Sequence, residues 1–195
     1  IISCRKFLNK SIKSNDNLIY GINTGFGSLY NKHISSDDLS KLQENLVLSH
    51  ACGIGEEVPN VIVKIMMLLK IQSLSFGFSG VQLVTIERLI EMFNNNILPV
   101  VYQQGSLGAS GDLAPLAHMS LPLIGYGDVR VLRKSSEGQK KYIKIKSSSL
   151  IKDKNWDTIS LQSKEGLALL NGTQFMSAYA VWSLIISKKL AYFQT

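Results

Sequence analysis

Apolar residues recur at helical spacing along most of this 195-residue chain, and this periodicity constrains the fold more than any other feature. Three such segments occupy the first half, at residues 35–53, 59–77 and 79–93. Their ends carry helix signals: Ser35 and Asp38 have the spacing of a capping box, and proline or glycine stands at several of the boundaries. We therefore expect three helices in this half.

The second half of the chain continues the helical pattern. Residues 113–124 form a short apolar segment that follows a glycine-rich stretch. Residues 164–170 and 173–193 are again apolar at helical spacing, with Asn171 and Gly172 between them. Together these patterns predict an all-α protein of the helical-bundle type.

A single β-hairpin is the expected exception. Residues 129–132 and 142–145 alternate in polarity on either side of a polar turn. Basic side chains cluster around this turn, in a chain whose net charge is +7. A single aromatic residue, Tyr142, lies among them, whereas binding of single-stranded nucleic acid needs several stacking rings. We interpret the cluster as a solvated basic surface and expect no nucleic-acid partner; its members are Arg133, Lys134, Lys140, Lys141, Lys144 and Lys146.

Cysteine usage and hydropathy bear on the compartment. Cys4 and Cys52 form neither a disulfide framework nor a metal-binding spacing, which fits a reducing, cytoplasmic environment and a site without metal. No segment reaches the roughly 18 uninterrupted apolar residues of a membrane span, so no membrane partner is expected. The chain begins at Ile1 and ends directly after an apolar helical segment, so we interpret it as a portion of a longer protein.

Residues 105–118 read Gly-Ser-Leu-Gly-Ala-Ser-Gly-Asp-Leu-Ala-Pro-Leu-Ala-His and are the most informative motif. A nucleophile elbow needs glycine two residues before and two residues after the serine. Ser110 has Gly108 and Asp112 at these positions, so that reading fails. A glycine-rich turn that caps a helix, with Ser110 or Asp112 as the N-cap, stays as the simplest alternative.

Three more segments contain candidate functional side chains. Tyr20 opens Tyr-Gly-Ile-Asn-Thr-Gly-Phe-Gly, a loop that lacks the Gly-Lys-Ser/Thr ending of a phosphate-binding loop. Ser49 and His50 stand at the end of an expected helix, and Asn171 and Gln174 flank a helix break. Taken singly, these residues are more simply read as a packed loop aromatic, a helix cap and a satisfied amide.

In this order, the four segments resemble the aromatic amino acid ammonia-lyases, and the resemblance covers essentially the whole chain. In that family an Ala-Ser-Gly tripeptide cyclises without other enzymes into 4-methylidene-imidazol-5-one. The resemblance implies that the Gly111 nitrogen attacks the Ala109 carbonyl and that Ser110 loses water. Gly111 suits this role because its amide is unhindered and its backbone is permissive. The product is an electron sink that needs no external cofactor.

The resemblance also implies the other site residues. Tyr20 would be the catalytic base, although a phenol is a weak base at neutral pH unless positive charge or a helix N-terminus lies near it. Asn171 would contact the substrate carboxylate and the prosthetic ring, with Gln174 supporting it. Ser49-His50 resembles the histidine-specific branch, since members that act on tyrosine or phenylalanine carry His-Leu or Phe-Leu there. His50 can hydrogen-bond an imidazole.

The implied reaction is elimination of ammonia from L-histidine to give trans-urocanate. Substrate could add to the electrophile through its amine or, less simply, through its ring. A tyrosine or phenylalanine lyase, an aminomutase and a non-catalytic helical scaffold are the alternatives. The resemblance further implies a homotetramer with shared active sites, and a C-terminal bundle, absent from this chain, that supplies an arginine for the carboxylate. Residues 1–195 alone are then expected to be the N-terminal portion, inactive and prone to aggregate.

Overall fold

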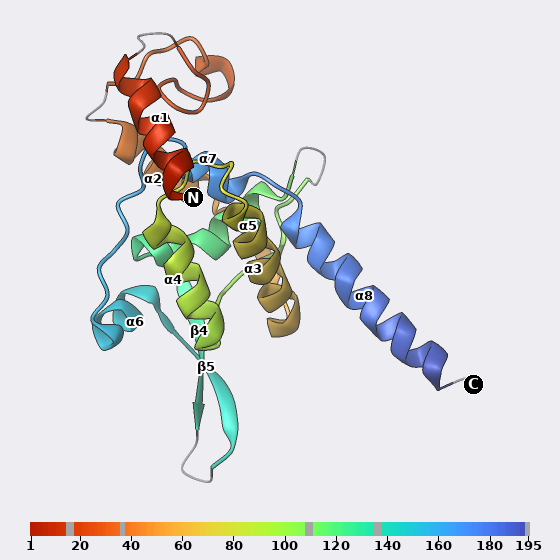
Figure 1. Ribbon diagram of the computed structural model, residues 1–195. Helices are drawn as coiled ribbons and strands as arrows, with labels where there is room; N and C mark the ends of the chain where they lie inside the picture. Colours follow the sequence, from red (N-terminus) through yellow and green to blue (C-terminus); the bar gives the residue numbers. More distant parts are fainter. Residues whose placement is uncertain (15–17, 36–37, 108–110, 135–137, 194–195) are drawn as a thin grey trace.

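Helix α3 (Asn60–Ser75) runs through the middle of the protein, as the computed structural model in Figure 1 shows. The structure describes residues 1–195 except 15–17, 36–37, 108–110, 135–137 and 194–195. Helix α3 packs against α4 (Leu83–Asn94) and α8 (Gln174–Tyr192). Five of its apolar side chains are fully buried and form the centre of the core; they are Ile62, Val63, Met66, Met67 and Leu74.

Three of the remaining helices and one 3-10 turn surround this core or extend it. Helix α2 (Leu39–His50) packs against both α5 (Leu113–Ser120) and α7 (Glu165–Leu170), and α5 also packs against α7. A 3-10 turn, η2 (Leu121–Ile124), continues α5 and is buried throughout. The fold class is therefore all-α, as the sequence predicts. Two helices were not anticipated, namely α1 (Ile2–Ser14) and α6 (Ser147–Lys154).

The helix ends test the predicted start and stop signals. Ser35 and Asp38 contact each other as predicted, because the Ser35 hydroxyl donates to Asp38 Oδ2 at 2.7 Å and the Asp38 N–H donates to Ser35 Oγ at 3.3 Å. The pair does not begin the helix, however, because α2 starts at Leu39 with Asp38 at the N-cap position and without a side-chain cap. Helix α3 stops before Gly77, whose φ is +79°. Helix α4 begins at Leu83 rather than at Ser79, because Gln82 is extended and its N–H donates to Glu165 Oε1 at 2.8 Å.

The predicted hairpin is present and belongs to a small antiparallel sheet. Strands β4 (Asp128–Lys134) and β5 (Lys140–Lys146) pair with Val131 opposite Ile143. Strand β2 (Ile97–Pro99) adds to the other edge of β4, and β1 (Ile54–Glu57) pairs with β3 (Tyr102–Gln104) in a separate sheet. These three short strands were missed, since three or four residues are too few for an alternating pattern to stand out.

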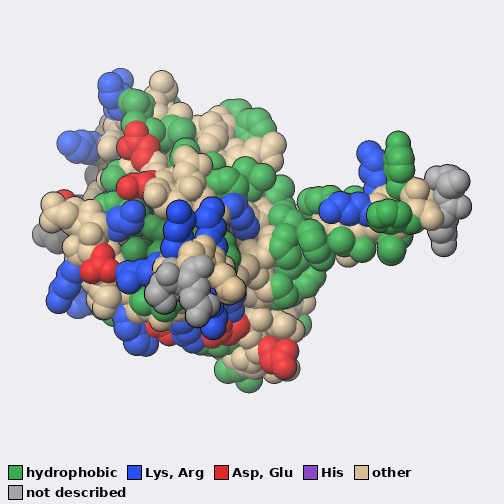
Figure 2. Space-filling model, turned by 90° about the horizontal axis from the view of Figure 1, so that it is seen from below, with side chains coloured by type: hydrophobic (Ala, Val, Ile, Leu, Met, Phe, Trp, Pro, Cys, Tyr) green, Lys and Arg blue, Asp and Glu red, His purple; other side chains and the backbone are tan. Residues whose placement is uncertain are grey.

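Carboxylates partly neutralise the basic cluster on the hairpin, which faces the viewer in Figure 2. Glu57 pairs with Arg130 and, at 2.6 Å, with Lys144. Lys146 pairs with Asp128 at 2.9 Å, and Arg133 lies 3.3 Å from Asp153 on α6. Because these pairs attach the hairpin to β1 and α6, at least part of the basic character serves the fold.

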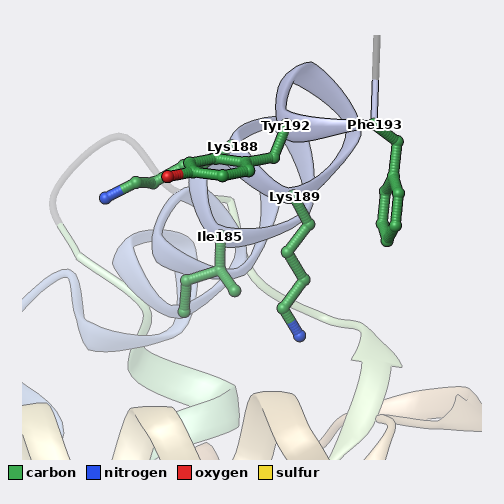
Figure 3. Close-up of a pocket in the computed structure, with 5 residues that line it drawn as sticks. All are labelled: Ile185, Lys188, Lys189, Tyr192 and Phe193. Atoms are coloured by element: carbon green, nitrogen blue, oxygen red, sulfur yellow. The ribbon is translucent and has the colours of Figure 1, made fainter. Parts of the chain in front are cut away.

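Helix α8 packs on α3 at its start and then projects away from the body, as both Figure 1 and Figure 2 show. Its apolar side chains are mostly exposed, Leu184 and Leu190 among them, and so is Phe193, which directly follows the helix. A cavity of about 560 Å³ lies between side chains of its last turns, from Ile185 to Phe193 (Figure 3). No predicted site residue lines this cavity. Among the described residues no helix is both long and apolar enough for a membrane span.

Candidate active site

Asp112 joins the glycine-rich loop to the segment between α7 and α8. Its N–H donates to the Gly172 carbonyl at 2.8 Å, and its Oδ2 accepts from the Met176 N–H, in the first turn of α8, at 3.0 Å. Ser106 Oγ donates to Oδ1 at 3.4 Å. Asp112 stands at the N-cap position of α5 but makes no side-chain cap there. Its carboxylate instead caps α8, where negative charge is favourable.

Gly111 is pressed against the same segment. Its φ is +125°, a conformation that residues with a side chain rarely adopt. A Cβ atom at this position would lie 2.9 Å from the Gly172 oxygen and 3.2 Å from the Gly172 nitrogen. Position 111 therefore requires glycine for both conformation and space, which fits the glycine of the predicted prosthetic group. Ala109 and Ser110, its other two predicted precursors, lie outside the described residues.

Asn171 ends α7 with an extended backbone at φ −81° and ψ 134°. Its N–H donates to the Leu167 carbonyl at 2.9 Å, and its own carbonyl accepts from Lys70 Nζ at 2.7 Å. The side chain is exposed and makes no hydrogen bond within the described part of the chain. The predicted helix break is confirmed. Because the side-chain amide is exposed, it is available to a ligand and needs no protein partner.

Gln174, predicted to support Asn171, is placed against Gly172 instead. It is the first residue of α8, and a Cβ at Gly172 would lie 2.3 Å from Gln174 Oε1. That oxygen is buried without a hydrogen-bond partner among the described residues. Gln174 thus packs over the same glycine that contacts Gly111, and no hydrogen bond links its amide to Asn171.

Lys70 is the site residue that the sequence prediction missed. Its side chain is 1% exposed, and burial lowers the pKa of its ammonium to about 7. A sequence signal existed, since Lys70 stands four residues after Met66 and four before Leu74, on the buried face of α3. A lysine in an apolar stripe needs an acceptor inside the protein, and here the Asn171 carbonyl provides it.

Tyr20 lies on an exposed, tightly turned loop. Its side chain is 54% exposed, its hydroxyl accepts from the Gly27 N–H at 3.4 Å, and its ring meets Phe26 edge-on at 6.0 Å between centroids. Gly21, at φ +71°, sits so close to α7 that a Cβ would lie 2.5 Å from Leu167 Cδ2. The loop therefore rests on the helix that ends at Asn171.

His50 is the last residue of α2 and turns one ring nitrogen back to its own helix. Nδ1 lies 2.8 Å from the Leu46 carbonyl oxygen, and this oxygen can only accept, so Nδ1 carries the hydrogen. Ser49 Oγ donates to the same carbonyl at 3.1 Å. Nε2 makes no hydrogen bond with any described residue. The fixed ring therefore leaves Nε2 to meet a ligand, as an acceptor when the imidazole is neutral.

A mainly apolar cavity of about 350 Å³ separates the tyrosine loop from α2. Ser49 and His50 line it on one side, with Phe26 on the other. Tyr20 and Asn171 do not belong to its wall. It is large enough for a small side chain and places His50 at its border, but it is not a complete site for an amino acid.

Contacts between backbone and side chains bring the four predicted segments together. The Gly166 N–H of α7 donates to Gln43 Oε1 of α2 at 2.9 Å. The Gly53 N–H, just after α2, donates to His118 Nε2 of α5 at 2.9 Å, which requires the unprotonated nitrogen. Burial lowers the pKa of His118 and so favours that neutral form. The segments that carry Tyr20, His50 and Asn171 are thereby connected, yet no hydrogen bond among the described residues joins these three side chains.

No group of three or more histidine, cysteine, aspartate or glutamate side chains within the described ranges could hold a metal ion. What the arrangement offers instead is a loop packed against a glycine peptide, an exposed amide, an exposed phenol and an imidazole with one available nitrogen. These groups can bind a carboxylate, move a proton and recognise a polar ring.

The chain resembles known proteins in sequence and in fold. Residues 1–195 match the family described as aromatic amino acid lyase. A histidine ammonia-lyase from Legionella pneumophila (strain Paris) is 49% identical over 181 residues, covering 93% of this chain and 34% of that protein. The crystal structure of histidine ammonia-lyase from Trypanosoma cruzi aligns with a TM-score of 0.84 and 34% identity, over 98% of this chain and 35% of that one. A phenylalanine aminomutase from Pantoea agglomerans aligns with a TM-score of 0.77 and 32% identity, over 90% and 32%. The chain thus spans about a third of the length of the curated relatives it matches.

Proposed function

Because the chain belongs to the aromatic amino acid lyase family, we propose that the protein containing it eliminates ammonia from L-histidine to give trans-urocanate. The similarity to proteins named histidine ammonia-lyase, together with Ser49-His50, carries this choice of substrate. The packing of Gly111 on Gly172 supports a prosthetic group made from Ala109, Ser110 and Gly111, since it demands glycine at the third position.

The methylidene-imidazolone would supply an electrophilic carbon and an electron sink. In this proposal Tyr20 removes the β-proton as general base, and its exposed hydroxyl is accessible to substrate. The exposed Asn171 amide orients the substrate carboxylate. His50 receives the imidazole N–H on Nε2, because Nδ1 is engaged by Leu46. Gln174 holds Gly172 in place beneath the loop.

The same proposal includes a cytoplasmic homotetramer whose active sites combine several subunits. The exposed apolar side chains of α8 support association, because a projecting helix with Leu184 and Leu190 in water is unfavourable. The incomplete cavity beside His50 supports shared sites, because further walls must come from elsewhere.

An aminomutase is the second candidate, favoured by the structural similarity to a phenylalanine aminomutase at 32% identity. The two outcomes differ in product. A lyase releases ammonia and urocanate, whereas an aminomutase returns the amine to the β-carbon. Product analysis with histidine, tyrosine and phenylalanine separates them.

Intact mass and turnover of the full-length protein test the proposal together. Cyclisation removes two water molecules, so the measured mass should be lower than the encoded mass by that amount. Ser110→Ala cannot form the methylidene and should fold normally with nearly all histidine turnover lost. A wild-type protein with the encoded mass and no urocanate production would favour the helical scaffold instead.

A further inference from the structure

Lys70 and the prosthetic-group loop contact opposite sides of one short backbone segment. Lys70 Nζ donates to the Asn171 carbonyl at 2.7 Å, from the centre of α3. The next peptide, that of Gly172, accepts the Asp112 N–H at 2.8 Å and is the surface against which Gly111 packs. A single peptide unit therefore separates the buried amine from the glycine that would supply the cyclising nitrogen.

The amine is well suited to hold this segment in place. Its side chain is 1% exposed, and the Asn171 carbonyl is its one acceptor among the described residues. No described carboxylate pairs with it, so the bond is not part of an ion pair. A buried amine with a single acceptor is costly to keep, and it is expected where its hydrogen bond has a use. Burial also lowers the pKa of Lys70 to about 7, and both the charged and the neutral amine can donate.

We propose that Lys70 is a positioning residue for formation of the prosthetic group. Its hydrogen bond fixes the Asn171 carbonyl, and the Gly172 peptide held in this way keeps Gly111 and Asp112 in the conformation that cyclisation requires. The inference rests on the proposed function, because it concerns the group on which that function depends. It adds a residue outside the four motifs, on a helix that carries no other candidate.

The chemistry that must be positioned is closure of a five-membered ring. A bond forms between the Gly111 nitrogen and the Ala109 carbonyl carbon. The Ala109 carbonyl oxygen leaves as water with one hydrogen from each of the Gly111 and Ser110 nitrogens. The Ser110 hydroxyl and its α-hydrogen leave as the second water. Closure between residues two apart requires a tightly turned backbone, so a support that holds Gly111 from one side raises the fraction of productive conformations.

The test compares four forms of the full-length protein: wild type, Lys70→Met, Lys70→Arg and Lys64→Met. Methionine keeps much of the lysine volume but has no N–H, and arginine keeps a donor. Lys64 is a matched control, because it lies on the same helix, donates to Asn96 Oδ1 at 2.5 Å and contacts the Phe93 ring, and neither partner belongs to the loop. The readouts are the fraction of folded molecules that lack two waters, the kcat per cyclised molecule and the thermal midpoint.

Lys70→Met should lower the cyclised fraction several-fold, while the kcat per cyclised molecule stays close to that of wild type. Lys70→Arg should keep most of both, and Lys64→Met should match wild type. A merely structural role would lower the thermal midpoint of Lys70→Met and leave the cyclised fraction of the folded protein unchanged, which would overturn the proposal. Equal defects in Lys70→Arg and Lys70→Met would also overturn it, since packing and not the donor would then matter.

Two further outcomes are decisive. If Lys70→Met does not fold, Lys70→Leu takes its place, because leucine also lacks an N–H, and the same mass comparison with Lys70→Arg decides. If wild type itself keeps the encoded mass, the proposed function fails, and the inference fails with it. If wild type is cyclised and Lys70→Met or its substitute is cyclised equally well, only the inference is wrong.

Discussion

Two regions of the candidate site differ in how they are held. The junction, comprising Lys70, Gly111, Asp112, Asn171 and Gly172, is linked by hydrogen bonds of 2.7 and 2.8 Å between segments far apart in sequence. The tyrosine–histidine face, comprising Tyr20, Ser49 and His50, relies on local contacts. Tyr20 bonds within its own loop at 3.4 Å, and the other two bond the preceding turn of α2.

This difference indicates that the two regions have different roles in the site. The junction determines the backbone shape of the glycine-rich loop, so changes there should alter whether the prosthetic group forms. The face presents side chains to a ligand and shapes no backbone beyond its own turn. Changes there should leave the group intact and alter turnover or substrate choice. Intact mass and kinetics, measured on the same variants of the full-length protein, can test this distinction.

Gly111→Ala should have the largest effect. The new methyl group would lie 2.9 Å from the Gly172 oxygen at a φ of +125°, so the loop must move away from its support. We expect loss of cyclisation by intact mass and loss of nearly all turnover. Gly138→Ala is the control, because Gly138 also has positive φ, at +79°, but no atom of the described residues lies within 4 Å of a Cβ placed there. Normal cyclisation in Gly111→Ala would contradict the steric argument.

Tyr20→Phe should come next and should act on rate alone. It deletes the hydroxyl of an exposed ring and keeps the contact with Phe26. We expect kcat to fall by about 10²–10⁴-fold while the mass still lacks two waters. Tyr30→Phe, a similarly exposed tyrosine in the same region, should be unaffected. An effect on KM alone would assign Tyr20 to binding.

Replacing Ser49-His50 with His-Leu or Phe-Leu should have a moderate effect on substrate choice. The change removes the imidazole, whose Nε2 makes no hydrogen bond with any described residue. It should raise the activation free energy that corresponds to kcat/KM for histidine by about 1–3 kcal/mol. Ser49→Ala alone should be nearly neutral, because Ser49 Oγ bonds its own helix. Unchanged preference for histidine over tyrosine and phenylalanine would place selection elsewhere.

His118 connects α5 with the chain just after α2, through the Gly53 N–H. Its replacement should give the smallest effect of the four, and this effect should be on stability. Its folded-state pKa is lowered by burial, so the native state favours the neutral ring that accepts the Gly53 N–H. The unfolded chain binds the proton more readily than the folded chain. The contribution of His118 to the free energy of unfolding is therefore present above a pH of about 6.5 and is lost as pH falls through the lowered pKa. His118→Phe cannot titrate. From pH 7 to pH 5 the thermal midpoint should fall more for wild type than for this variant. Equal decreases in the two proteins would contradict the assignment.

Local patterns predicted much of the fold because they act over short distances. The contact between Ser35 and Asp38, the hairpin and the break at Asn171 all appear where expected, although α2 begins only at Leu39. The start of α4 was misplaced because Gln82 is held by Glu165, more than 80 residues away. No local signal encodes such a contact.

The candidate site divides in the same way. Its motifs could be found from the sequence, because Tyr20, His50, Gly111 and Asn171 stand in distinctive local frames. The capping of α8 by Asp112 could not, since the acceptor and the helix are 64 residues apart.

The sequence by itself determined the helical class, the family and the residue types that its chemistry needs, since these follow from periodicity and short motifs. The tertiary structure decided which groups support one another. Lys70 is simply a lysine in an apolar stripe until α3 and the end of α7 come together and its amine meets the Asn171 carbonyl. The physical reason is burial: a polar group removed from water must find its partner across the fold, and only the packed chain determines which partner that is.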